Sequence, residues 1–133
     1  MNASESAIRV LVVDDEPSIC RALTIALSRA GFAVRATVTG DDALAVLRAE
    51  AVDVLVLDLR IPDLRGDAIF QMATALQPHL RAQTLFVTGD VTEHAEALVA
   101  ACGAHFIRKP FALADVINAV HALVPPRRHS ASA

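Results

Sequence analysis

Five short apolar runs alternate with stretches in which apolar residues recur at helical spacing, and this alternation restricts the fold more than any other feature of the chain. The runs are rich in β-branched residues, as strands are, and each is followed by a helical pattern. Strict alternation predicts one parallel sheet with helices on both faces, joined by right-handed crossovers. The predicted strands are residues 8–13, 33–38, 54–57, 84–87 and 106–107.

Residues typical of helix ends separate these units. Pro17 stands at the first position of a helix, and Thr39 is a predicted N-cap. Gly31 and Gly103 are predicted helix stops. The third predicted helix follows Gly66 and ends at Pro78, and the last covers residues 112–123.

Composition and charge limit the classes of protein that this chain can represent. Its 133 residues are 54% hydrophobic with a mean hydropathy of +0.45, which predicts one domain with a substantial core, residues 8–124, between flexible ends at 1–7 and 125–133. A net charge of -3 and a pI of about 5.9 argue against nucleic acid as a direct partner. Charged residues or prolines interrupt every apolar stretch, and the N-terminal residues lack a signal-peptide pattern. We therefore expect a cytoplasmic protein with no membrane partner.

Cysteine and histidine give no sign of a transition-metal site. Cys20 and Cys102 lie in helical patterns and are predicted to be buried thiols. The five histidines have no zinc-ligand spacing between them or with the cysteines.

Polar residues suited to phosphate and magnesium chemistry stand at the ends of the apolar runs. They are Asp14, Asp15, Asp58, Thr88 and Lys109. Carboxyl ends of parallel strands open into one crevice, so we expect these residues to meet there, with Mg²⁺ relieving the repulsion between the carboxylates. Each residue also has an ordinary interpretation: helix capping for the aspartate pair, a turn at Asp58, a strand residue at Thr88 and a surface lysine at Lys109.

Four short motifs give the chain a specific resemblance. They are VVDDEPS at 12–18, DLRIPDLRG at 58–66, VTGD at 87–90 and KPF at 109–111. In this order, at these strand ends, they resemble the receiver domain of two-component response regulators over about residues 9–123. The resemblance implies a flavodoxin-like, doubly wound fold: a five-stranded parallel sheet of order 2-1-3-4-5 with five helices.

The resemblance also implies a role for each acidic residue. Asp58 would be the phosphoacceptor, taking a phosphoryl group from the phosphohistidine of a histidine kinase or a phosphotransfer protein. Mg²⁺ would be held by Asp58, by Asp15 directly, by Asp14 through water and by the backbone carbonyl of Arg60.

Residues of the fourth and fifth strands would bind the phosphoryl group and transmit its arrival. The resemblance implies that Thr88 and Lys109 bind phosphoryl oxygens and that the Lys109-Pro110 bond is cis. It also implies that Thr88 moves toward the phosphoryl group and that Phe106 then turns inward, altering an output face at about residues 91–124. The alternative for Phe106 is a fixed core aromatic.

Two residues beside the site depart from common family residues. Arg60 lies two positions after the expected phosphoacceptor and Asp90 lies two after Thr88. We expect them to tune how fast phosphate arrives and leaves by pairing across the mouth of the site; two unrelated solvated charges are an equal alternative.

Other classes fit the sequence less well. A phosphatase of the haloacid dehalogenase type needs Asp-x-Asp, whereas residues 14–16 read DDE and residues 58–60 read DLR. A module that no longer needs phosphorylation would be expected to lack one of the key residues. We expect a single-domain response regulator, not an enzyme, that contacts an unidentified downstream protein; the alternative is a receiver from a hybrid kinase.

Overall fold

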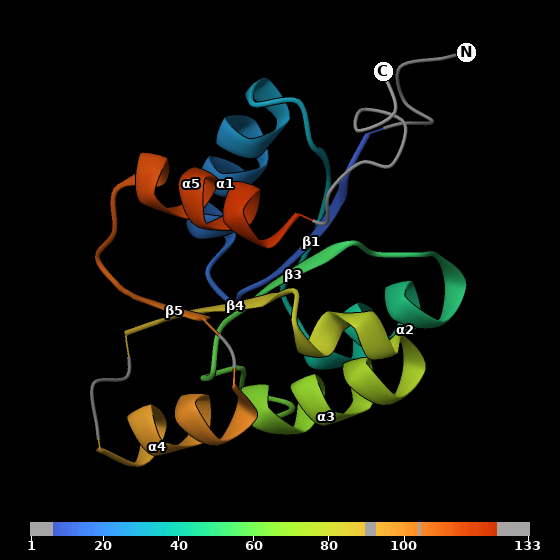
Figure 1. Cartoon of the computed structure of the whole chain (residues 1–133), viewed down its shortest axis with the longest axis vertical. Helices are drawn as coiled ribbons and strands as arrows, with labels where there is room; N and C mark the ends of the chain where they lie inside the picture. The colour runs from blue at the N-terminus through green and yellow to red at the C-terminus, as the bar shows by residue number, and fades with distance from the viewer. Residues whose placement is uncertain (1–6, 90–92, 104, 125–133) are drawn as a thin grey trace.

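All strands of the protein lie parallel in one sheet. The computed structural model describes residues 7–89, 93–103 and 105–124, and its five-stranded sheet has the order β2-β1-β3-β4-β5 (Figure 1). The predicted fold class and strand order are therefore confirmed. None of the helices in these residues combines the length and the apolar content needed to cross a membrane. The elements are β1 (Arg9–Val13), α1 (Pro17–Arg29), β2 (Ala33–Thr37), α2 (Gly40–Ala49), β3 (Val54–Leu57), α3 (Gly66–Leu76), the 3₁₀ helix η2 (Pro78–Arg81), β4 (Thr84–Thr88), α4 (Glu93–Cys102), β5 (His105–Arg108) and α5 (Leu113–Leu123).

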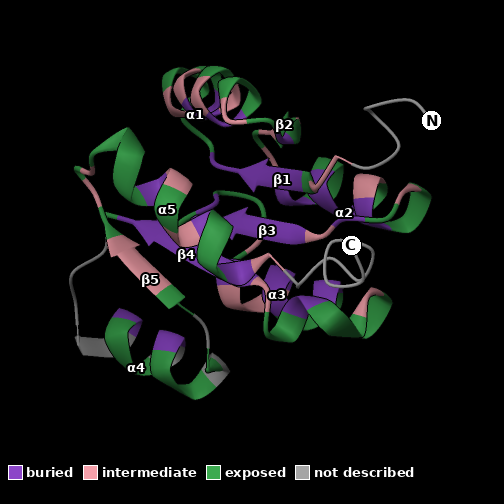
Figure 2. Ribbon diagram, turned by 45° about the horizontal axis from the view of Figure 1, so that its top comes forward, coloured by how far each residue is buried: buried purple, intermediate pink, exposed green. Residues whose placement is uncertain are grey.

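Helices cover both faces of the sheet and bury its central strands. Helices α1 and α5 lie on one face, and α2, α3 and α4 lie on the other (Figure 1). Alternate strand residues belong to the two cores: Val12 and Val56 pack with α1 and α5, whereas Leu11 and Leu57 pack with α2 and α3. Strands β1, β3 and β4 are buried almost throughout, while the edge strand β5 is partly exposed (Figure 2).

The predicted helix ends are observed. Pro17 occupies the start of α1, and the Thr39 hydroxyl accepts a hydrogen bond from the Asp42 backbone N–H at 3.1 Å. Gly31 and Gly103, which follow α1 and α4, have φ of 100° and 69°. These left-handed values favour glycine, which has no Cβ to clash.

The element boundaries differ from the prediction where pairing, and not hydropathy, sets the end of a strand. The fifth strand includes His105 and Arg108 because both pair with β4, opposite Leu85 and Thr88. The 3₁₀ helix η2, which begins at Pro78, was not predicted.

The structure tests the predicted burial of one of the two cysteine thiols. Cys20 is buried in α1, as predicted. Cys102 ends α4, but its side chain lies outside the described residues.

The Gln77 side chain helps to fasten the edge of the sheet opposite the strand carboxyl ends, where His79 and Gln83 also bond to the backbone that enters β3. The Gln77 amide nitrogen donates to the carbonyls of Leu47 and Glu50, both at 2.9 Å, and its oxygen accepts from the Val52 N–H at 2.9 Å. Gln77 thereby bonds to the last turn of α2 and to the backbone that follows it before β3. This arrangement fixes where β3 enters the sheet.

Replacing Gln77 with alanine should lower the free energy of unfolding by about 1–3 kcal/mol, because backbone groups in a partly buried position lose their partners. Denaturant unfolding followed by circular dichroism measures this change. Gln71→Ala is the matched control: Gln71 is exposed on α3 and its change should stay within about 0.5 kcal/mol. Equal effects of the two substitutions would contradict the role given to Gln77.

Candidate functional site

The centre of the site is the ammonium group of Lys109. Its Nζ lies 2.8 Å from Asp14 Oδ2, 2.9 Å from Asp58 Oδ2 and 2.9 Å from Glu16 Oε1. Asp14, Asp58 and Lys109 directly follow β1, β3 and β5, so the carboxyl ends of these strands bring them together. The predicted convergence of the two aspartates and the lysine is observed, and Lys109 is not a solvated surface lysine, since its side chain is only 14% exposed.

Both carboxylate oxygens of each buried aspartate have a partner that fixes the orientation of the side chain. While Oδ2 faces Lys109, Asp14 Oδ1 accepts from the Glu16 backbone N–H at 2.9 Å and Asp58 Oδ1 accepts from the Arg60 N–H at 3.0 Å. Glu16, and neither aspartate, occupies the N-cap position of α1, and the Glu16 side chain makes no capping hydrogen bond. The alternative interpretation of Asp14 and Asp15 as helix caps is therefore wrong.

Burial and ion pairing shift the pKa values of the charged groups in this cluster in opposite directions. Burial raises the pKa of the Asp14 carboxyl group, and the contacts with Lys109 and with the Glu16 N–H counteract only part of that rise. For Lys109 burial acts to lower the pKa, but the hydrogen bonds to Asp14, Asp58 and Glu16 outweigh it and raise the pKa well above its ordinary value. The lysine therefore remains a cation at every pH near neutrality.

The negative charge of the acidic side chains at this site exceeds the positive charge of Lys109. Asp14, Asp15, Glu16 and Asp58 each offer an oxygen, and these atoms lie within 4.8 Å of one another. Lys109 supplies one positive charge to the group. Oxygen donors at this spacing with excess negative charge fit a hard divalent cation such as Mg²⁺.

Thr88 lies at the same edge of the sheet. It is the last residue of β4, is fully buried and accepts the Lys109 backbone N–H at its carbonyl oxygen, at 2.8 Å. The Lys109-Pro110 bond is cis, which is the isomer that the resemblance implied.

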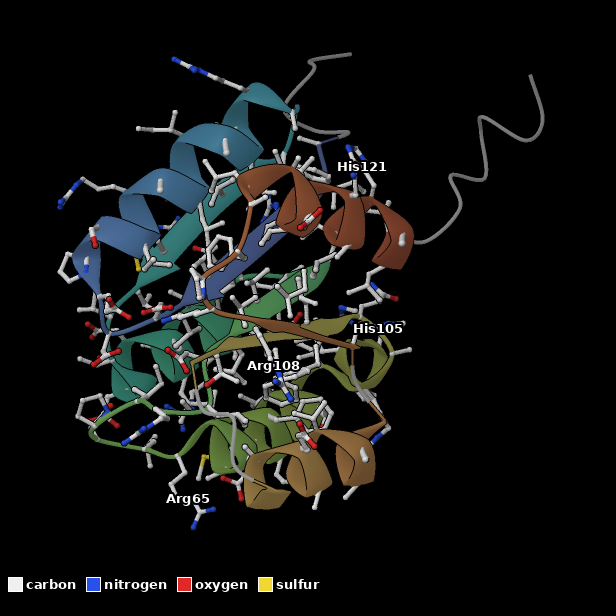
Figure 3. The ribbon with its side chains drawn as sticks, turned by 90° about the vertical axis from the view of Figure 1, so that its left-hand side faces the viewer. Arg65, His105, Arg108 and His121 are labelled. Atoms are coloured by element: carbon white, nitrogen blue, oxygen red, sulfur yellow. The ribbon has the colours of Figure 1, made fainter. Side chains whose placement is uncertain are left out.

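A hollow of about 810 Å³ opens beside Asp58. Its lining includes the acidic Asp15 and the basic Arg60 and Arg65. Both arginines are exposed, and Arg65 points outward from the start of α3 (Figure 3). Asp90, the expected counterpart of Arg60, lies outside the described residues.

The loop after β3 passes so close to Gly66 that no side chain fits there. A Cβ on Gly66 would lie 2.5 Å from the Asp58 carbonyl oxygen and 2.6 Å from Leu59 Cα. Both atoms belong to the backbone, so a side chain at this position would displace the loop that carries Asp58. The sequence showed Gly66 as the residue before a helix but gave no sign of this close approach.

Asp63 joins the same loop to α2. Its carboxylate accepts from the backbone N–H groups of Gly40 at 2.9 Å and Asp41 at 3.0 Å, and these bonds lower its pKa. This contact could not be predicted from the sequence, because Asp63 caps a helix more than 20 residues away, whereas capping signals are local.

An ion pair joins β5 to α4 next to the site. The Arg108 guanidinium pairs with Glu96, reaching from the strand toward the helix (Figure 3). Phe106, on the same strand, is partly buried and packs against the core that includes Ala95 and Val99 of α4. Its predicted switching between two positions stays a prediction.

Comparison with known proteins gives a consistent result. The family model described as response regulator receiver domain matches residues 10–121. The probable transcriptional regulatory protein TcrX of Mycobacterium tuberculosis is 31% identical over 122 residues, which are 92% of this chain and 52% of TcrX. The chain thus spans about half the length of such curated relatives.

Solved structures of response regulators are similar to this chain over most of its length. A CheY-like receiver domain from Methanospirillum hungatei has a TM-score of 0.82 at 25% identity, covering 88% of this chain and 93% of its own. A Burkholderia pseudomallei response regulator, solved with a phosphorylated aspartic acid, a calcium ion and citrate, has a TM-score of 0.76 at 25% identity, covering 94% of this chain and 69% of its own.

Gly66→Ala should destabilise the protein by about 1–3 kcal/mol, because the added Cβ would overlap backbone atoms of Asp58 and Leu59 and force the loop to move. Denaturant unfolding measures the stability, and the backbone amide shifts of residues 58–60 in NMR spectra should show the displaced loop. Gly89→Ala is the control, since a Cβ there would meet Lys109 at an ordinary 3.9 Å. A Gly66→Ala protein as stable as Gly89→Ala would refute the steric argument.

Asp63→Asn should reduce stability at neutral pH but not in acid. Because the folded-state pKa of Asp63 is lowered, its charge stabilises the fold above the ordinary pKa of 3.8, and this contribution is lost as the pH falls through the folded-state value. Unfolding free energies of wild type and Asp63→Asn, measured from pH 7 to pH 3, should converge. Asp42→Asn removes an equal charge from the first turn of α2 but leaves both hydrogen bonds of Asp63 in place, so it is the control for charge alone. A loss of stability at pH 7 as large as that of Asp63→Asn would contradict the role given to the Asp63 hydrogen bonds.

Proposed function

The chain belongs to the family of response regulator receiver domains of two-component systems, and on that premise we propose that it accepts a phosphoryl group on Asp58 from a phosphohistidine. The observation that carries the proposal is the placement of the Lys109 ammonium 2.8 Å from Asp14 and 2.9 Å from Asp58. A nucleophilic carboxylate, a fixed cation and further acidic oxygens are the parts that phosphoryl transfer requires.

In the proposed reaction a carboxylate oxygen of Asp58 attacks phosphorus. The bond between phosphorus and the donor imidazole nitrogen breaks, a P–O bond to Asp58 forms, and the released imidazole takes a proton from solvent. Lys109, which is already in contact with Asp58 Oδ2, would pair with an oxygen of the transferred group. The Thr88 hydroxyl would donate to another phosphoryl oxygen.

The acidic cluster supports a Mg²⁺ site as part of this proposal. Asp14, Asp15 and Asp58 would hold the ion together with the backbone carbonyl of Arg60, whose N–H is already bonded to Asp58. A bound Mg²⁺ supplies positive charge for the phosphoryl oxygens. Asp14 and Asp58 are oriented for this by backbone hydrogen bonds at their other oxygens.

We propose that the output face is α4, β5 and α5. A phosphoryl group that draws Thr88 toward it would let Phe106 turn inward and alter the packing against α4. A gap of a few kcal/mol between two such states is small enough for a phosphoryl group to reverse. The Arg108–Glu96 ion pair, which joins β5 to α4, would respond to the same movement.

We propose that the donor is a histidine kinase or a phosphotransfer protein and that the downstream partner is another protein. TcrX is called a transcriptional regulatory protein, but the match covers about half of it, so the proposal here concerns the receiver domain at residues 8–124.

Catalysis is limited to phosphorylation and dephosphorylation of Asp58 itself: the position two residues later holds Arg60, where a dehalogenase-type phosphatase needs an aspartate.

The decisive test is intact mass spectrometry after incubation with Mg²⁺ and acetyl phosphate. Wild type should gain one phosphoryl group, and Asp58→Asn should gain none, because the amide is not a nucleophile for this step. The gain should also vanish when a chelator removes Mg²⁺. Asp53→Asn, at the opposite end of β3, is the matched control and should react like wild type. No uptake by wild type, or equal uptake by Asp58→Asn, would refute the proposal.

A further inference from the structure

Glu16 is the third acceptor of the Lys109 ammonium, and no motif in the sequence indicates this contact. The Glu16 side chain leaves the start of α1 and places Oε1 2.9 Å from Lys109 Nζ. The ammonium has three N–H groups, and in this structure they face the carboxylates of Asp14, Asp58 and Glu16. A new acceptor must therefore displace one of these three.

The three acceptors differ in how easily they can leave. The side chains of Asp14 and Asp58 are 4% and 5% exposed, whereas that of Glu16 is 56% exposed. A buried carboxylate that loses its cation stays desolvated, which is strongly unfavourable. Glu16 can instead turn into water at little cost. It is therefore the acceptor that a phosphoryl oxygen would replace.

We propose that Glu16 is a positioning residue that holds Lys109 in the resting state and competes with the incoming phosphoryl group for that ammonium. The inference rests on the proposed phosphorylation of Asp58. It predicts that the Glu16 carboxylate slows phosphoryl uptake, since its ion pair with Lys109 must break before Lys109 can pair with a phosphoryl oxygen.

Asp67 is an acidic residue near Glu16 that pairs with another cation. Asp67 lines the same hollow, but its carboxylate pairs with Arg65 at 3.2 Å. Asp67→Asn therefore removes one negative charge from the hollow without touching Lys109. It is the matched control for a general effect of charge.

The first experiment measures the rate of phosphoryl uptake from acetyl phosphate with Mg²⁺ by intact mass spectrometry. Glu16→Gln, which keeps the size of the side chain but not its charge, should react about twofold to fivefold faster than wild type, the range that an exposed ion pair supplies. Asp67→Asn should react at the wild-type rate. Equal acceleration by both substitutions, or none by Glu16→Gln, overturns the inference.

Repeating the comparison in a Lys109→Met background tests whether Glu16 acts through the lysine. The acceleration by Glu16→Gln should disappear there, and its persistence would overturn the inference. A second measurement does not depend on reactivity: the Lys109 side-chain ¹⁵N resonance of the resting protein should shift in Glu16→Gln and stay unchanged in Asp67→Asn. An unshifted resonance in Glu16→Gln overturns the inference even if Lys109→Met takes up no phosphoryl group.

The same experiment separates two kinds of failure. A wild type that gains no phosphoryl group contradicts the proposed function. A wild type that reacts on Asp58 at the same rate as Glu16→Gln leaves that function intact and contradicts only the role of Glu16. Calorimetric titration with Mg²⁺ should give similar affinities for both proteins, and a tenfold weaker affinity in Glu16→Gln would overturn the inference by making Glu16 a metal ligand.

Discussion

The Lys109 ammonium joins segments that would otherwise repel one another at the carboxyl edge of the sheet. Asp14 follows β1 and Asp58 follows β3, and the two buried carboxylates face the same cation at 2.8 and 2.9 Å. Without that cation, two charges removed from water would stand side by side, which costs far more than an exposed ion pair contributes. The same constraint gives the site its chemistry, since the cation that holds the carboxylates in the resting protein is available to phosphoryl oxygens.

The scaffold makes this arrangement possible by keeping the surrounding backbone fixed. Strands β1, β3 and β4 are buried on both faces, so their ends have little freedom. The loop after β3 is held from two directions: its backbone rests against Gly66, and Asp63 binds the N-terminus of α2. Asp58 therefore keeps its position without relying on Lys109 alone. The Glu16 side chain, by contrast, is more than half exposed, so water can take the place of Lys109 as its partner.

Local patterns were enough to predict most of the architecture. Two features made this possible: apolar runs bounded by glycine and proline, and polar residues at the ends of those runs. The Thr39 cap and the helix stop at Gly31 were also predicted, because both signals lie within a few residues of the helix end. The extent of β5 was predicted too short, since His105 and Arg108 join the sheet through backbone pairing with β4 and not through hydropathy.

The sequence by itself determined the succession of strands and helices along the chain and which polar residues would reach one edge of the sheet, because hydrophobic periodicity is local and strict alternation of strands and helices makes the strands parallel. Only the tertiary structure decided which atoms meet there. Glu16 and Lys109 are 93 residues apart, Asp63 and Gly40 are 23 apart, and Gln77 binds backbone 25 to 30 residues away. Contacts of this kind leave no periodic trace in the chain, since they depend on how the finished layers of sheet and helix bring distant atoms within hydrogen-bonding distance.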